Sequence, residues 1–103
     1  SEFDKLFAEC THVGTKTYSR PSSMLTCCPT DGQSEILIEH DIPPRYIKSI
    51  IVGNEHVADH INAILTTCKF KADIYIAPDV CNTNWSSLVR MGNRPTENKY
   101  NAD

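Results

Sequence analysis

The sequence predicts a small α+β domain in which helices pack on one face of an antiparallel sheet of three to four strands. Residues 35–39 and residues 72–76 alternate apolar side chains with a period of two, which is typical of half-buried strands. Between them, residues 44–52 and 56–68 place apolar side chains at steps of three and four, which is typical of amphipathic helices. We therefore expect a strand, helix, turn, helix, strand unit.

The N-terminal residues predict a short helix. Phe3, Leu6, Phe7 and Cys10 recur at helical spacing, with charged residues on the opposite side, so we expect an amphipathic helix over residues 3–10. A helix of this length does not persist alone in water, so it must dock on something. Two interpretations remain open: it covers the core of its own domain, or it contacts a partner.

A hairpin is expected next. Residues 24–28 predict a strand. Pro29-Thr30-Asp31-Gly32 is typical of a turn, and it leads to the strand predicted at residues 35–39. Between the first helix and this hairpin the chain is polar and interrupted by Gly14 and Pro21, so a loop is favoured over a brief strand at residues 16–18. We expect residues 1–34 to form an N-terminal extension to a domain over residues 35–103.

Capping residues set the bounds of the two central helices. Asp41 is a candidate N-cap, and Pro43 or Pro44 falls where the first helical turn tolerates a missing N–H. Gly53 and Asn54 both accept positive φ, so they are expected to end the first helix and reverse the chain.

The second helix, residues 56–68, is expected to turn one stripe of side chains inward. Its members are Val57, Ile61, Ile64, Leu65 and Cys68. After the second strand the chain is irregular. Residues 85–91 then predict a third strand, and the sequence before Pro95 predicts the start of a last helix.

Composition indicates a globular cytoplasmic protein. The chain is 40% hydrophobic with a net charge of −3, so no overall positive field attracts it to phosphate backbones. No apolar run approaches the roughly 20 residues that a membrane span needs. Five cysteines is an odd number for a disulfide framework, which favours reduced thiols in the cytoplasm or nucleus. Asn84-Trp85-Ser86 is an N-glycosylation acceptor pattern, so a small secreted domain stays open as an alternative.

The order of the expected elements resembles a type I KH domain, β-α-α-β-β-α, over residues 35–103. The resemblance extends to Ile42-Pro43 with the following isoleucines, to Ile74-Tyr75-Ile76-Ala77-Pro78-Asp79, and to Leu88-Val89-Arg90-Met91-Gly92. Among KH proteins, Pro78-Asp79 and the Asn-rich loop after it are similar to the Bicaudal-C group. The resemblance implies a protein of post-transcriptional RNA control, including translation regulation.

In that family a Gly-x-x-Gly loop between the helices lets the backbone approach RNA phosphates closely. Here Gly53 stands for the first glycine, but His56 occupies the place of the second and Glu55 adds negative charge, which repels phosphate. We therefore expect a non-catalytic scaffold that holds a protein partner or a neighbouring domain. The alternative is direct binding of single-stranded RNA through the KH groove.

The candidate residues follow from these two alternatives. For a protein partner they are Phe3, Leu6 and Phe7, or an unpaired strand edge at residues 24–28. For RNA they are Gly53, Asn54, Lys48, Lys69 and Lys71. No cofactor, small-molecule substrate or membrane is expected as a partner.

Metal binding and catalysis are disfavoured by residue spacing. Cys10, His12, Cys27 and Cys28 do not match common zinc-ligand spacings, so no metal site is expected. His56 and His60 share a helix face, but the glutamate of a zinc protease is missing after the first histidine. Cys68 with either histidine is a conceivable nucleophile pair, but Cys68 falls on the predicted core stripe. We therefore expect no enzymatic activity.

Overall fold

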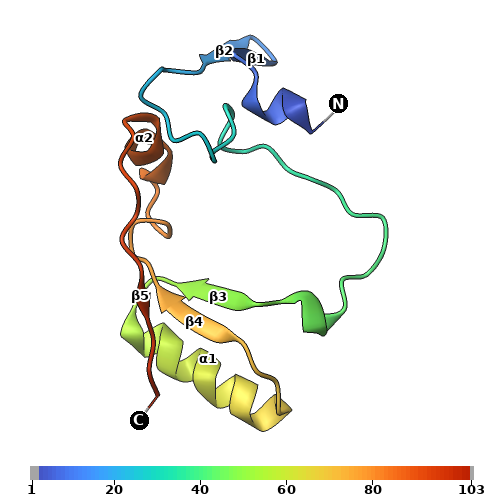
Figure 1. Cartoon of the computed structure of the whole chain (residues 1–103), viewed down its shortest axis with the longest axis vertical. Coiled ribbons are helices and arrows are strands. Elements are labelled where there is room, and N and C mark those ends of the chain that lie inside the picture. The colour runs from blue at the N-terminus through green and yellow to red at the C-terminus, as the bar shows by residue number, and fades with distance from the viewer. Residues whose placement is uncertain (1–2, 103) are drawn as a thin grey trace. The chain divides into compact units, whose positions relative to one another are not determined.

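The computed structural model describes residues 3–102 and confirms the α+β class, with one two-stranded and one three-stranded sheet (Figure 1). The chain divides into two compact units. The first unit comprises residues 1–38 and 86–94, and the second unit comprises residues 39–85 and 95–103. The predicted domain boundary between residues 34 and 35 stays a prediction.

The second unit is built on a strand-helix-strand crossover. Strand β3 (Ser49–Val52) leads into helix α1 (Glu55–Cys68), which returns the chain to strand β4 (Asp73–Ile76). β3 pairs with β4 in parallel, and β4 pairs with the short antiparallel strand β5 (Asn98–Lys99). Helix α1 lies against β3 and β4 (Figure 1).

The core of the second unit lies between α1 and this sheet. Its buried members are Val52, Ala58 and Ile74. Half-buried side chains pack around them: Ile50, Ile61, Leu65, Ile76 and Tyr100. Full burial of a valine or isoleucine contributes about 1.5–3 kcal/mol, so these contacts hold the helix on the sheet.

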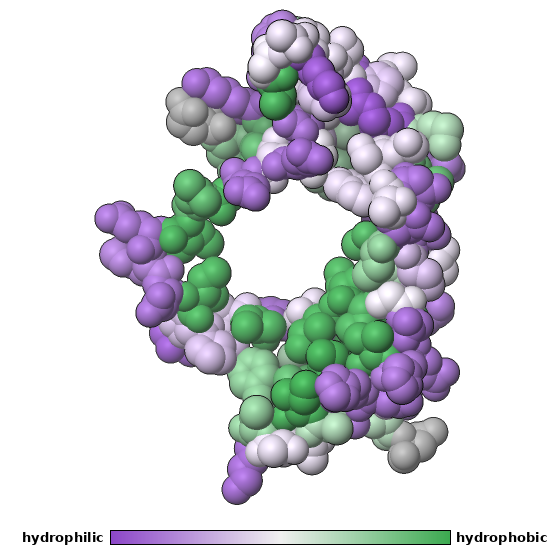
Figure 2. Space-filling view, turned by 180° about the vertical axis from the view of Figure 1, so that it is seen from behind, coloured by the Kyte–Doolittle hydropathy of each residue, from purple (hydrophilic) through white to green (hydrophobic). Residues whose placement is uncertain are grey.

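Side chains of alternate strand residues point to the other face of this sheet. Ile51 pairs with Tyr75 in the β3–β4 register, and both alternate along their strands with the residues that face the core. Ile51 is 48% exposed, and Figure 2 shows apolar side chains at the surface of this unit.

Local capping explains where α1 begins and ends. The side chain of Asn54 accepts a hydrogen bond of 2.9 Å from the N–H of Val57, which satisfies one of the free donors of the first turn. At the other end Lys69 adopts the left-handed conformation with φ 55°. The N–H of Phe70 then donates to the carbonyl oxygen of Leu65 at 3.0 Å. The helix predicted over residues 56–68 is therefore confirmed.

The first unit contains a hairpin and two short helices. The 3-10 helix η1 (Asp4–Phe7) precedes strands β1 (Cys10–Val13) and β2 (Lys16–Ser19), which pair antiparallel. Helix α2 (Trp85–Arg90) joins this unit from Ser86 onward.

A buried threonine connects the loop after the hairpin to η1. Thr30 is fully buried, and its hydroxyl donates a hydrogen bond of 2.5 Å to the carbonyl oxygen of Ala8. Arg20 donates from one guanidinium nitrogen to the Thr30 hydroxyl at 3.2 Å and to the carbonyl oxygen of Cys28 at 2.8 Å. Buried polar groups are stable only when they are bonded in this way, so these contacts fix the loop.

The helix predicted over residues 44–52 is wrong. The 3-10 helix η2 (Pro44–Tyr46) occupies only its start, and β3 occupies its end. Ile50, Ile51 and Val52 are β-branched and suit a strand once β4 is available as a partner. The parallel β3–β4 pair also contradicts the expected antiparallel sheet, and the two consecutive helices of a KH domain are not formed by these residues.

The expected strands at residues 24–28 and 35–39 are also wrong, because the structure assigns no strand to either segment. Residues 85–91 form helix α2 with a following turn instead of a strand, and β5 lies where the last helix was expected. The N-terminal helix is shorter than predicted, and residues 16–18, for which a loop was favoured, lie in β2.

Candidate functional site

One pocket of the first unit brings a carboxylate next to apolar side chains. It has a volume of about 310 Å³ and is lined by Phe3, Leu6, Glu35, Ile36 and Leu37. The main chain of Leu6 is fixed because its carbonyl oxygen accepts a hydrogen bond of 2.7 Å from the N–H of Thr30. The pocket therefore lies between η1 and an irregular segment that contributes the carboxylate of Glu35.

Glu35 begins an exposed apolar run. Ile36, Leu37 and Ile38 are 61%, 89% and 63% exposed, which is unusual for consecutive large apolar residues in a folded unit. A carboxylate with apolar walls on one side suits a small ligand that is partly apolar and develops positive charge. Sequence reasoning assigned this run to a half-buried strand and missed Glu35 as a site residue. The sequence signal that could have indicated this site is an acidic residue, Glu35, directly before the apolar run.

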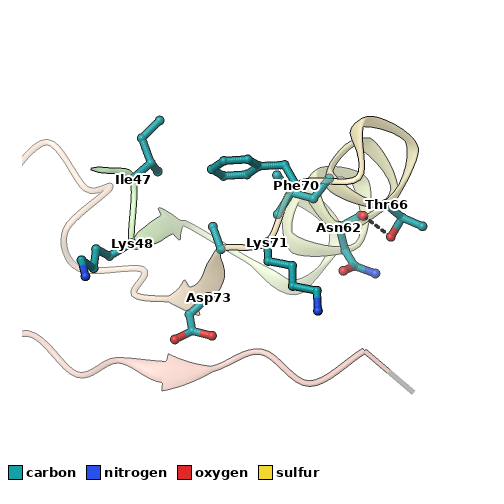
Figure 3. Close-up of a pocket in the computed structure, with 9 residues that line it drawn as sticks. Ile47, Lys48, Asn62, Thr66, Phe70, Lys71 and Asp73 are labelled. Atoms are coloured by element: carbon teal, nitrogen blue, oxygen red, sulfur yellow. Dashed lines mark hydrogen bonds between the residues drawn. The ribbon is translucent and has the colours of Figure 1, made fainter. Parts of the chain in front are cut away.

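A second pocket, of about 510 Å³, lies at one end of the sheet in the second unit (Figure 3). Lys48, Asn62, Phe70, Lys71 and Asp73 are among its lining residues. It combines two cations, an amide and an aromatic ring, which are groups that bind phosphates and planar rings.

The residues proposed for RNA do not form one site. Gly53 and Asn54 lie at the N-terminal end of α1, whereas Lys69 caps its C-terminal end. A helix of 14 residues separates these ends by about 20 Å. Lys48 and Lys71, in contrast, share the second pocket.

The residues proposed for a protein partner lie on η1 or beside it. The rings of Phe3 and Phe7 are 5.9 Å apart, and the guanidinium of Arg20 lies 5.7 Å from the centre of the Phe7 ring. Phe3 and Leu6 line the first pocket, so part of this group faces a ligand-sized space of its own unit.

The predicted inward stripe of α1 is only partly correct. Ile61 and Leu65 pack against the core, but Val57 and Ile64 are 38% and 45% exposed, and Cys68 is exposed as well. Cys68 and His60 line a shallow pocket of about 220 Å³ with Ile64. They lie eight positions apart on one helix, and no hydrogen bond between them is present in the described part of the chain.

All five cysteines carry free thiols. The sulfur atoms of Cys27 and Cys28 are 3.9 Å apart, and His12 is hydrogen-bonded to the Thr17 hydroxyl. Within residues 3–102, no group of three or more His, Cys, Asp or Glu side chains is placed to hold a metal ion. No helix among these residues is both long enough and apolar enough to span a membrane.

Comparison with known proteins identifies a family. The family model described as "DarT: ssDNA thymidine ADP-ribosyltransferase, DarT" matches residues 4–85, which include all residues of both larger pockets except Phe3. No curated protein and no solved structure matches the chain. The family match contradicts the resemblance to a KH domain of the Bicaudal-C group.

Proposed function

Because the chain belongs to the DarT family of single-stranded DNA thymidine ADP-ribosyltransferases, we propose that it takes part in the transfer of ADP-ribose from NAD⁺ to thymidine in single-stranded DNA. The match over residues 4–85 carries this proposal. The pocket with Glu35 supports it, because the reaction needs a carboxylate and the pocket supplies one beside apolar walls.

The function expected from the sequence is therefore wrong in several respects. A non-catalytic scaffold for post-transcriptional or translational RNA control, and direct RNA binding, are both replaced by an enzyme family that acts on DNA. The expectation of no small-molecule substrate is wrong as well, because ADP-ribosyl transfer consumes NAD⁺. The cytoplasmic location stays a prediction.

The reaction sets clear demands on the protein. The bond between the ribose carbon and the nicotinamide nitrogen of NAD⁺ breaks, and nicotinamide leaves with the bonding electrons. A bond then forms between that carbon and an atom of thymidine, which loses its proton. As in other glycosyl transfers, positive charge builds up on the ribose ring in the transition state, so a nearby carboxylate lowers the barrier.

Glu35 is our candidate for this carboxylate. Leu6, Ile36 and Leu37 line the same pocket, so a ligand that covers these apolar side chains would lie next to the Glu35 carboxylate. The aromatic side chain of Phe3 gives the same pocket a flat apolar wall that fits a nicotinamide ring. Asp73, in the other pocket, is ion-paired with Lys99 at 3.5 Å and is less suited to this role.

The test compares two carboxylates of the same segment. The protein is incubated with NAD⁺ and a thymidine-containing single-stranded oligonucleotide, and mass spectrometry measures the addition of one ADP-ribose. We expect Glu35→Gln to lower the rate by about 100-fold or more, because a group that stabilises charge only in the transition state is lost.

Glu39→Gln is the matched control, because Glu39 is exposed and lies outside the pocket. Its rate should equal that of the wild-type protein. An oligonucleotide without thymidine should stay unmodified. Equal rates for the two variants would reject the role of Glu35, and an unmodified oligonucleotide with the wild-type protein would reject the proposed function itself.

A further inference from the structure

We propose that the pocket lined by Lys48 and Lys71 holds the single-stranded DNA, with phosphates of the strand against the two lysines and a base against Phe70. This inference rests on the proposed function, and it assigns the DNA strand to the second unit. The observations that carry it are the position of the two cations at one edge of the sheet and the turn that presents Phe70.

The parallel pairing of β3 and β4 places the two lysines together. Lys48 directly precedes β3, and Lys71 lies two positions before β4, so both occupy the same end of the parallel pair. The N–H of Asp73 donates a hydrogen bond of 3.2 Å to the carbonyl oxygen of Lys48, which fixes the main chain of one segment to the other. The sheet thus fixes the main-chain positions from which the two lysine side chains extend.

Phe70 is presented by the end of α1. The left-handed residue Lys69 turns the chain, and the hydrogen bond from Phe70 to Leu65 folds it back over the helix. The Phe70 ring and Ile47 point toward each other on one side of the pocket, whereas the Lys48 and Lys71 side chains extend away from them and from each other, with Asp73 between the two lysines (Figure 3). A base against the ring therefore has its phosphate on the side of the lysines.

The charges around the pocket favour an anion. Asp73 lines the pocket, but Lys99 pairs with its carboxylate at 3.5 Å, and both side chains are more than half exposed. This pair offsets the negative charge of Asp73 and leaves Lys48 and Lys71 as the excess positive charge. Since the whole chain carries a net charge of −3, a phosphate strand is attracted to such a local site and not to the surface in general.

Asn62 adds a group that can recognise a base. It is half-buried and lines the pocket, and its main-chain carbonyl oxygen accepts a hydrogen bond of 2.9 Å from the Thr66 hydroxyl. An aromatic ring for stacking, cations for the backbone and an amide for the base edge are the parts from which single-strand binding sites are built.

Fluorescence anisotropy of a labelled oligothymidine strand, titrated without NAD⁺ over a series of salt concentrations, tests the proposal. Lys48→Ala and Lys71→Ala should each weaken binding about fivefold, and the double variant more than tenfold. For each lost phosphate contact the slope of log affinity against log salt should fall by about 0.7. Phe70→Leu should weaken binding roughly tenfold with an unchanged slope, because stacking is lost and charge is not.

Lys16→Ala is the control, since Lys16 is an exposed lysine of β2 in the first unit. It should bind like the wild-type protein. Thermal unfolding of each lysine variant should match the wild-type protein, because the substituted lysines are exposed. If Lys48→Ala and Lys71→Ala bind the strand as Lys16→Ala does, the pocket is not the DNA site.

Steady-state kinetics separate this proposal from the proposed function. In the lysine double variant we expect a higher KM for the oligonucleotide, with the KM for NAD⁺ unchanged. A rise in the KM for NAD⁺ alone would assign the pocket to the NAD⁺ phosphates and overturn the inference. If the wild-type protein modifies DNA while both lysine variants keep wild-type affinity, only this inference fails. If the lysine variants lose DNA affinity but no ADP-ribose is transferred, only the proposed function fails.

Discussion

The guanidinium of Arg90 donates a hydrogen bond of 2.8 Å to the carbonyl oxygen of Thr30, 60 positions earlier in the chain. Its other terminal nitrogen donates to the carbonyl oxygen of Ser19 at the end of β2. The side chain of Arg90 in α2 thus contacts two segments of the first unit. The two sequence ranges of this unit, residues 1–38 and 86–94, are therefore held together in part by this arginine.

Loss of this arginine should destabilise the first unit. Arg90→Ala removes charged donors from two carbonyl oxygens, and we expect the free energy of unfolding to fall by about 2 kcal/mol. Urea unfolding followed by circular dichroism measures it. Arg94→Ala is the control, because Arg94 is exposed, and should change stability by less than about 0.5 kcal/mol. Equal effects of the two substitutions would contradict the role of Arg90.

Two glycines with positive φ should respond differently to alanine. Gly92 has φ 82°, and a Cβ there would lie 2.6 Å from the carbonyl oxygen of Ser23, whereas Gly14 has φ 61° and open space around it. Gly14→Ala should cost about 1 kcal/mol for the backbone conformation alone. Gly92→Ala should cost clearly more, because the main chain must also move. Thermal unfolding of the pair provides the comparison, and similar costs would rule out the steric contribution.

The N-cap of α1 can be tested at Asn54. Asn54→Ala removes the acceptor for the Val57 N–H and should lower the free energy of unfolding by about 1 kcal/mol. Asn54→Asp keeps an acceptor and adds negative charge at the positive end of the helix dipole, so its stability should be at least that of the wild-type protein. Chemical denaturation distinguishes them. An alanine variant as stable as the aspartate variant would show that the cap contributes nothing.

The thiol of Cys28 should make stability depend on alkaline pH. Burial raises the pKa of Cys28, the neighbouring Cys27 raises it further, and Arg20 and Arg94 lower it less. Because the folded pKa lies above the unfolded one, the unfolded chain loses this proton first. Stability is therefore unaffected below the unfolded pKa and falls as the pH rises toward the folded pKa.

Urea midpoints of the wild-type protein and Cys28→Ala, measured from about pH 7 to pH 10, test this linkage. Titrating groups that do not interact with Cys28 contribute equally to both proteins, so the difference measures Cys28 together with its neighbour Cys27. The wild-type protein should lose more stability than the variant over the alkaline part of this range. Parallel curves would exclude a contribution from Cys28.

The candidate sites were only partly accessible from the sequence. Lys48 and Lys71 were named as contacts for a nucleic-acid backbone, but their shared pocket depends on the parallel register of β3 and β4. Glu35 was missed because its pocket is formed with Leu6 of η1 and with Phe3 just before it, which are far away in sequence. A contact between residues so far apart in the sequence produces no local sequence pattern.

By itself, the sequence determined the α+β class, helix α1 and strand β4. A helix closes its hydrogen bonds within one segment, so the spacing of Ile61 and Leu65 and the caps at its ends are sufficient to specify it. Tertiary structure decided whether each remaining apolar run became a strand. Residues 49–52 form one because β4 offers partners for their N–H and C=O groups, whereas residues 35–39, equally rich in isoleucine, pair with no strand among the described residues. A strand is completed only by hydrogen bonds to another segment, and that segment is chosen by the fold.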